Sequence, residues 1–233
     1  NQEVWGRYTF LGYDPKLEIT CMNGEMCIRE SGSEEGAKEP VAHPGEKIKE
    51  ILKEYTSPKV KDLPSFTGGL VGYFSYDYVK YSEPKLNLDA DDQEGFKDVD
   101  LMLFDKVIAF DNLRQKIYII ANARTENLEQ EYDRCLAEIE EIVDLIEHGT
   151  PAQITPGKIT SEFRPLFSEQ EYCAMVEKAK HYIYEGDIFQ VVLSNRLEAD
   201  YEGSLFNAYR MLRTINPSPY MFYFSSDDIE VAG

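Results

Sequence analysis

The sequence VDLMLFDKVIAFDNLRQKIYIIAN, at residues 99–122, predicts a β-hairpin. Residues 99–110 and 115–122 are rich in β-branched, aromatic and other apolar side chains, which are typical of strands. The residues between them, 111–114, are Asp-Asn-Leu-Arg, and Asp and Asn favour turns. We therefore expect two strands joined by a short turn near the middle of the chain.

The residues before this hairpin predict more strands and one helix. Residues 6–28 hold two short apolar segments and end in Asn23-Gly24, a dipeptide typical of hairpin turns. Residues 44–55 combine a Pro in the first turn with apolar residues at helical spacing. Residues 67–79 are rich in Gly and aromatic residues but lack the order of a phosphate-binding loop, so we expect a strand with close backbone approach.

The residues after the hairpin predict a long helix and then a domain boundary. Apolar side chains recur every three or four residues between Leu128 and Ile146, and acidic residues fill the opposite face. Residues 151–162 contain Pro, Gly and Thr and have the composition of a linker. We therefore expect a first domain at residues 1–150 and a second at residues 163–233.

The second domain begins with a strong helix signal. Ser168 and Glu171 form a capping box, and Gly186 is a suitable residue to end the helix. Residues 187–196 are apolar on both faces, which predicts a central strand of a sheet.

A second helix and two strands are predicted further along. Ser204 caps this helix, residues 216–221 form a turn, and strands follow at residues 221–224 and from Ile229. The fold class is α+β, with mixed or antiparallel sheets packed against helices. Because the last strand is interrupted at Gly233, we expect the sheet of this domain to be incomplete.

Composition excludes several classes of partner. The 233 residues include 24 basic and 43 acidic side chains, for a net charge of −19. Such a surface repels phosphate backbones and anionic lipids, so neither nucleic acid nor a membrane is expected as a partner. Four cysteines without a CxxC pair favour neither a zinc site nor a disulfide framework, and no long apolar run is present. We expect a cytoplasmic protein.

The turn at residues 216–221, Asn-Pro-Ser-Pro-Tyr-Met, is the first candidate site. Two prolines make it rigid, and it presents Tyr220 and Met221 at the start of a strand. A rigid turn suits recognition of a small molecule because little entropy remains to be lost on binding. An ordinary turn with both side chains packed in the core explains the same pattern.

Gln190 and Arg7 are the other candidates. Gln190 interrupts the apolar face of the predicted central strand, where its amide either contacts a substrate or bonds a neighbouring loop. Arg7 is flanked by Trp5 and Tyr8, and a guanidinium in this setting can bind a carboxylate through two hydrogen bonds. An exposed Arg without such a role is the alternative.

Four ordered motifs resemble the large, chorismate-using subunit of anthranilate synthase, component I. They are GRYTFLG at residues 6–12, GGLVGYFSYD at residues 68–77, GDIFQVVLS at residues 186–194 and NPSPYM at residues 216–221. The resemblance implies the fold of chorismate-utilising enzymes. It also implies the family's reaction, in which ammonia aminates chorismate at C2 with loss of the C4 hydroxyl, and pyruvate is then eliminated to give anthranilate.

The resemblance also implies partners and a cofactor. In that family a glutamine amidotransferase subunit, component II, supplies ammonia from glutamine, Mg²⁺ holds the substrate carboxylate, and L-tryptophan inhibits the enzyme. Pro219, Tyr220 and Met221 look like part of the tryptophan site, and Arg7 is similar to a basic residue near the tryptophan carboxylate. Gln190 resembles a position of the substrate pocket that isochorismate-forming relatives fill with Lys. The Mg²⁺ ligands and the catalytic His are expected after Gly233, so these 233 residues alone are expected to be inactive.

Two alternatives stay open. The related component I of aminodeoxychorismate synthase, in folate synthesis, shares the fold and the substrate, although the Pro-Tyr-Met turn favours anthranilate synthase. A non-catalytic regulatory module that binds an amino acid is the alternative from another class. Catalytic residues after Gly233 would exclude that second alternative.

Overall fold

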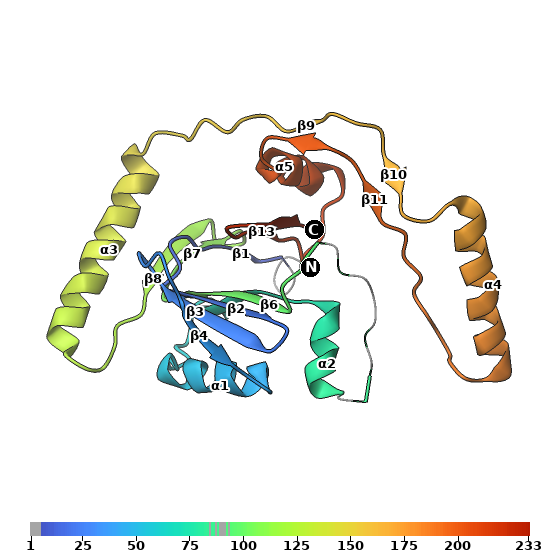
Figure 1. Ribbon diagram of the computed structural model, residues 1–233. Coiled ribbons are helices and arrows are strands. Elements are labelled where there is room, and N and C mark those ends of the chain that lie inside the picture. The colour runs from blue at the N-terminus through green and yellow to red at the C-terminus, as the bar shows by residue number, and fades with distance from the viewer. Residues whose placement is uncertain (1–5, 84, 87, 89–91, 93) are drawn as a thin grey trace. The chain divides into compact units, whose positions relative to one another are not determined.

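The computed structural model describes residues 6–83, 85–86, 88, 92 and 94–233. The chain divides into two compact units, Asn1–Pro151 and Ala152–Gly233. This division lies next to the limit predicted for the first domain, at residue 150. Both units combine helices with antiparallel strands, which confirms the α+β class (Figure 1).

The larger sheet of the first unit has five antiparallel strands in the order β4-β3-β2-β6-β5. These strands are β2 (Leu17–Met22), β3 (Glu25–Glu30), β4 (Ala37–Pro40), β5 (Gly69–Phe74) and β6 (Val99–Phe104). The predicted turn at Asn23 and Gly24 joins β2 to β3, and both residues have positive φ. That conformation matches the twist of the two strands, so the hairpin prediction is confirmed.

The core of the first unit lies between this sheet and the helix α1 (Pro44–Glu54), which was predicted at residues 44–55 (Figure 1). Its buried side chains are those of Ile19, Cys21, Met26, Ile48, Val99 and Leu101. In β5, a Cβ on Gly72 would collide with the backbone carbonyl of Asp100 on β6. The close backbone approach predicted for the glycine-rich segment is therefore present at this position.

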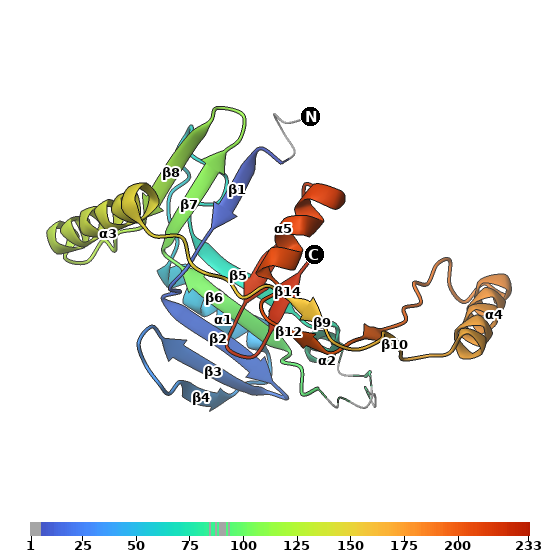
Figure 2. The ribbon, with the colours of Figure 1, turned by 90° about the horizontal axis from the view of Figure 1, so that it is seen from above.

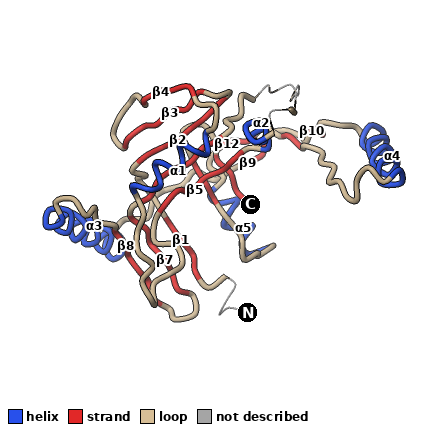
Figure 3. Tube along the Cα trace, turned by 90° about the horizontal axis from the view of Figure 1, so that it is seen from below, coloured by secondary structure: helices blue, strands red, loops and turns tan. Residues whose placement is uncertain are grey.

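The segment predicted as one strand at residues 99–110 forms two strands in different sheets. After β6 the chain bends at Asp105 and continues as β7 (Lys106–Asp111). β7 lies between β1 (Tyr8–Leu11) and β8 (Lys116–Ala121) in an antiparallel sheet of three strands (Figures 2 and 3). The bend is fixed because the Asp105 carbonyl accepts hydrogen bonds from both the backbone and the side-chain amide of Asn122. Apolar side chains continue across the bend, so their pattern could not reveal it.

The glycine-rich segment also departs from its prediction as a strand at residues 67–79. β5 ends at Phe74, and the chain turns into the short helical elements η1 (Tyr76–Tyr78) and α2 (Val79–Ser82). The Tyr78 ring contacts both the Phe74 ring, at 4.9 Å between centroids, and the Tyr81 ring, at 5.4 Å. Aromatic packing across the turn thus replaces the predicted extension of the strand.

The long helix α3 (Leu128–His148) confirms the amphipathic helix predicted there. It packs against β8 and buries Cys135 and Ile142. Arg134 holds it in place by donating hydrogen bonds to Glu131 and Glu138 on the same helix and to the backbone carbonyl of Asn122. The bend at residue 105 and the first half of α3 are therefore joined through Asn122.

The second unit contains two longer helices and three short antiparallel strand pairs. Its elements are β9 (Lys158–Ile159), β10 (Arg164–Pro165), α4 (Glu169–Glu185), β11 (Leu197–Glu198), β12 (Tyr201–Glu202), α5 (Phe206–Ile215), β13 (Tyr223–Ser225) and β14 (Glu230–Ala232). β9 pairs with β12, β10 with β11, and β13 with β14. The capping box of Ser168 and Glu171 is present at the start of α4, and Gly186 ends that helix with φ of 82°.

One prediction for the second unit is wrong. The segment predicted as a linker, residues 151–162, includes the two-residue strand β9, and its role as a linker stays a prediction. Residues 187–196, predicted as a central strand, form none: they are mostly exposed, with Phe189 fully accessible and Val192 81% accessible. No described strand pairs with this apolar segment, so it takes part in no hydrogen-bonded ladder.

Candidate functional site

The rigid turn lies between α5 and the β13–β14 hairpin, as predicted. The helix ends at Ile215, and the backbone N–H of Asn216 still donates to the Leu212 carbonyl at 2.9 Å. Beyond the prolines, the Tyr220 N–H donates to the Ser218 hydroxyl at 3.3 Å, and Phe222 begins the ladder by exchanging two hydrogen bonds with Gly233. The turn is thus anchored at both ends within the second unit.

The side chains of the turn differ in exposure. Pro219 and Tyr220 are exposed, Tyr220 with 67% of its surface accessible, and Met221 is partly buried. An exposed tyrosine on a rigid turn is accessible to a ligand. The alternative of an ordinary turn with both side chains packed in the core does not describe Tyr220.

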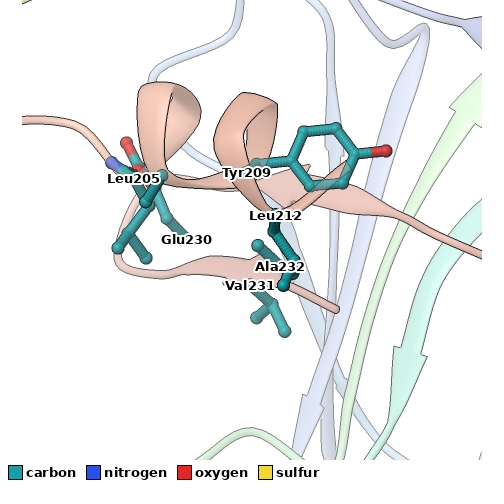
Figure 4. A pocket seen from close by; sticks show the side chains of 7 residues that line it. Leu205, Tyr209, Leu212, Glu230, Val231 and Ala232 are labelled. Carbon is teal, nitrogen blue, oxygen red and sulfur yellow. Dashed lines mark hydrogen bonds between the residues drawn. The ribbon is translucent and has the colours of Figure 1, made fainter. Parts of the chain in front are cut away.

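An apolar groove of about 470 Å³ lies between α5 and β14 of the second unit (Figure 4). It is lined by Leu205, Ala208, Tyr209 and Leu212 of the helical side and by Glu230, Val231 and Ala232 of the strand. Leu205 and Glu230 lie at one end of the groove, and the Tyr209 hydroxyl points away from them (Figure 4). Pro219, Tyr220 and Met221 do not line it.

Glu230 is the charged residue of the groove, and its carboxylate is already engaged. It accepts a hydrogen bond from the backbone N–H of Leu205 at 2.7 Å and lies 3.5 Å from the Ser204 hydroxyl. The Ser204 hydroxyl in turn accepts from the N–H of Phe206. The Ser204 side chain thus bonds the first residue of α5, but Leu205 occupies the N-cap position and has no side-chain cap, so the cap predicted at Ser204 is one residue early. Glu230 provides a negative charge at the same helix start, where it interacts favourably with the helix dipole.

Arg7 lies in the first unit, immediately before β1, and binds Asp111. Its Nε lies 3.1 and 3.2 Å from the two carboxylate oxygens of Asp111, and its Nη2 lies 2.7 Å from Oδ2. The Asp111 side chain is fully buried, and 22% of the Arg7 side chain is accessible. The guanidinium also lies over the Tyr8 ring, with its carbon 4.8 Å from the ring centroid. Trp5, predicted as its other neighbour, lies outside the described residues.

Asp111 is a residue whose role was not predicted from the sequence. Hydrogen bonds from Arg7 lower the pKa of its carboxyl to about 2, and backbone N–H groups of Leu113 and Arg114 contribute to the same shift. The same pairing raises the pKa of Arg7. The signal was present, because Asp at the first position of a turn commonly accepts bonds from the following N–H groups. Its partner, 104 residues away, gave no such signal.

Gln190 lies on the segment 187–196 and is exposed. The expectation that its amide is buried on a central strand is wrong for this structure. An exposed amide can hydrogen-bond water at little cost in free energy. Gln190 therefore needs no protein partner or substrate to satisfy its amide. Its place in a substrate pocket stays a prediction.

Arg7 belongs to the first unit and Pro219, Tyr220 and Met221 to the second. The residues predicted to form the effector site thus come from two units, and the contacts of each group are given within its own unit. No group of three His, Cys, Asp or Glu side chains in the described part of the chain is arranged to hold a metal ion. None of the helices among the described residues is long and apolar enough to cross a membrane.

Another buried carboxylate, Asp98, organises the first unit. It accepts a hydrogen bond from the Tyr81 hydroxyl at 2.7 Å and pairs with Lys80 at 2.7 Å. Burial is the main reason why the pKa of Tyr81 is raised, and the bond to Asp98 adds to this shift. The Tyr81 hydroxyl also accepts from the N–H of Gly24. This network ties α2 to the β2–β3 turn and is a structural feature, because its polar groups bond one another.

Comparison with known proteins assigns the family. Residues 2–233 match the family described as chorismate binding enzyme. The chain belongs to this family. The chorismate binding enzymes most similar to it include anthranilate synthase component 1 of Acetivibrio thermocellus, 36% identical over 99% of this chain and 48% of the relative. Anthranilate synthase component 1 of Aquifex aeolicus is 38% identical over 99% of this chain and 47% of its own length.

A solved structure agrees with these relatives. The crystal structure of anthranilate synthase component I from Streptococcus pneumoniae matches 97% of this chain and 49% of its own, with a TM-score of 0.74 and 26% sequence identity. This structural match confirms the predicted fold. Our chain spans about half the length of the relatives it matches.

Proposed function

We propose that this chain contributes to an anthranilate synthase component I, which aminates chorismate and eliminates pyruvate to give anthranilate for tryptophan biosynthesis. The observation that carries the proposal is the similarity to anthranilate synthase component 1 proteins along 99% of the chain. The motifs at residues 6–12, 68–77, 186–194 and 216–221 are distributed over the same length.

The proposed reaction uses ammonia as its nucleophile. Gln190 supports this choice, because a neutral amide cannot remove a proton from water at neutral pH, whereas ammonia needs no such base. The ammonia would come from glutamine through a component II amidotransferase. We assign no step to Mg²⁺, because the described residues provide no cluster of ligands for it.

We propose that L-tryptophan inhibits the complete gene product and binds at Pro219, Tyr220 and Met221. The turn supports this role because it is anchored at both ends and leaves Tyr220 accessible. A preordered site loses little entropy when a ligand binds. Arg7 belongs to the same proposal.

An assay of the complete gene product tests the activity. With chorismate, Mg²⁺ and ammonia, anthranilate should appear and can be followed by its fluorescence, whereas the 233 residues alone should give none. Formation of aminodeoxychorismate in place of anthranilate would assign the protein to the folate branch. Tryptophan binding without turnover of chorismate would favour a regulatory module.

Calorimetry tests the effector separately. Titration of the complete gene product with L-tryptophan should show saturable binding. Absence of binding in a protein that forms anthranilate would contradict the proposed regulation and leave the proposed reaction standing.

A further inference from the structure

We propose that Arg7 and Asp111 form a clasp that fixes the start of β1 against the β7–β8 turn, so that Arg7 is a positioning residue and not the group that contacts an effector carboxylate. The clasp itself rests on contacts within the first unit. Its consequence for inhibition rests on the proposed tryptophan regulation.

The first observation is how the two side chains meet. Asp111 faces the side of the guanidinium that carries Nε and Nη2, and this edge makes bonds to both carboxylate oxygens. A planar fork that meets a carboxylate in this way is held in one orientation, unlike an ammonium group. The Tyr8 ring beneath the guanidinium restricts it further.

The second observation is that Asp111 has a structural task on its other side. Its Oδ1 accepts hydrogen bonds from the backbone N–H groups of Leu113 at 3.1 Å and Arg114 at 3.0 Å. The buried carboxylate therefore shapes the turn between β7 and β8 while it holds Arg7. Its negative charge is buried together with a cation, which is the arrangement that makes such burial tolerable.

The third observation is a set of bonds that runs parallel to the ion pair. The backbone N–H of Asn112 donates to the Arg7 carbonyl at 2.8 Å. The Asn112 side-chain amide lies 3.2 Å from the Thr9 hydroxyl and 3.4 Å from the Gly6 carbonyl. The turn is thus hydrogen-bonded to Arg7 and to residues on both sides of it.

These contacts matter because β1 is a short edge strand, and the other side-chain contact described for it is the edge-on packing of Phe10 against Phe66. The strand is four residues long and lies at the edge of its sheet, where it pairs only with β7 among the described strands. An edge strand this short is held by one ladder, and its end frays unless side chains fix it. Loss of either member of the clasp should therefore release the same segment.

Four variants of the complete gene product test this inference: Arg7→Gln, Asp111→Asn, the double variant, and Arg114→Gln as a matched control. The control removes a positive charge from the same turn but keeps the N–H that Asp111 accepts. Arg7→Gln and Asp111→Asn should each lower the melting temperature by about 4 °C or more and speed amide exchange at residues 8–11. The double variant should be no worse than either single one, because both remove one interaction.

Inhibition by tryptophan provides the readout that distinguishes positioning from stability alone. Arg7→Gln and Asp111→Asn should both weaken inhibition, by a similar factor of about five or more, while KM for chorismate stays unchanged. Arg7→Lys keeps the charge but not the fork, and should behave like Arg7→Gln. Arg114→Gln should leave melting, exchange and inhibition as in the parent protein.

Three results would overturn the inference. Weak inhibition in Arg7→Gln and normal inhibition in Asp111→Asn would make Arg7 a direct ligand. Additive losses of melting temperature in the double variant would show that the two residues act separately. Unchanged exchange at residues 8–11 in both single variants would exclude a clasp. If tryptophan does not inhibit the parent protein, the proposed regulation is wrong. The melting temperatures and the amide exchange at residues 8–11 still test the clasp in that case.

Discussion

Two apolar segments of this chain, residues 99–110 and 187–196, look alike in sequence and differ in structure. The first provides β6 and β7, in which Val99 and Ala109 are fully buried. The second leaves Phe189 fully accessible and forms no strand. The difference is the presence of partners: β6 lies between β2 and β5, and β7 between β1 and β8, whereas no described strand pairs with residues 187–196. An apolar run therefore indicates that a strand can be buried, and the partner decides whether it is.

The largest expected effect on stability comes from comparing the loss of a buried side chain beside β6 with the loss of an accessible one in residues 187–196. Ile19→Ala, in β2 beside β6, removes a fully buried side chain and should lower the free energy of unfolding by about 2 to 5 kcal/mol. Phe189→Ala removes an accessible side chain and should change it by about 0.5 kcal/mol or less. Urea denaturation followed by circular dichroism measures both. Equal losses would mean that residues 187–196 are packed in solution.

Glycines give a second, smaller contrast. Gly72→Ala should cost about 2 to 3 kcal/mol, because the new methyl group meets the Asp100 carbonyl and φ is positive. Gly186→Ala should cost about 1 kcal/mol, because φ is positive but the space around it is open. The same urea series measures both losses of unfolding free energy. A larger loss for Gly186→Ala than for Gly72→Ala would contradict the open space around Gly186.

Acid stability should distinguish the ion pairs of the two units. The pKa of Asp111 lies at about 2 in the folded protein, below its ordinary value of 3.8. Such a group contributes stability that is fully present above about pH 4 and is lost as the pH falls towards 2. Asp111→Asn should flatten the pH dependence of the melting temperature in this window.

The matched control for acid stability is Asp200→Asn in the second unit. Asp200 pairs with Arg164 at 2.8 Å, but 65% of its side chain is accessible, and solvent screens such a pair. Its pKa is lowered chiefly by the hydrogen bond from Arg164. We expect Asp200→Asn to change the pH dependence of the melting temperature less than Asp111→Asn does. A larger change with Asp200→Asn would contradict the buried pairing of Asp111.

The smallest effect on stability is expected at the rigid turn. Met221→Ala should lower the free energy of unfolding by about 1 kcal/mol or less, because Met221 is only partly buried. It should nevertheless weaken tryptophan inhibition about tenfold or more and leave chorismate turnover largely intact. Enzyme assays with and without tryptophan measure this, and Met211→Ala, on the exposed side of α5, is the control. Parallel loss of turnover and inhibition would contradict a separate effector site.

Local signals in the sequence predicted most of the elements. The Asn23-Gly24 turn, the capping box of Ser168 and Glu171, and the amphipathic pattern of α3 each depend on residues close together in the chain, and all three are present. The bend at Asp105 was missed because it is made by Asn122, 17 residues further along. The pairing of Arg7 with Asp111 was missed for the same reason, and the strand predicted at residues 187–196 failed because its pattern contains no information about a partner.

The pairing of β1 with β7 also has a consequence for synthesis on the ribosome. Tyr8 pairs with Asp111, so the amino-terminal strand is made about a hundred residues before its partner. At a synthesis rate of 5 to 20 residues per second, β1 waits about 5 to 20 s without a neighbour. During that time its Phe10 and Leu11 side chains are available to other nascent chains or to chaperones. The three-stranded sheet can therefore form only after β7 and β8 are made, about a hundred residues later than β1.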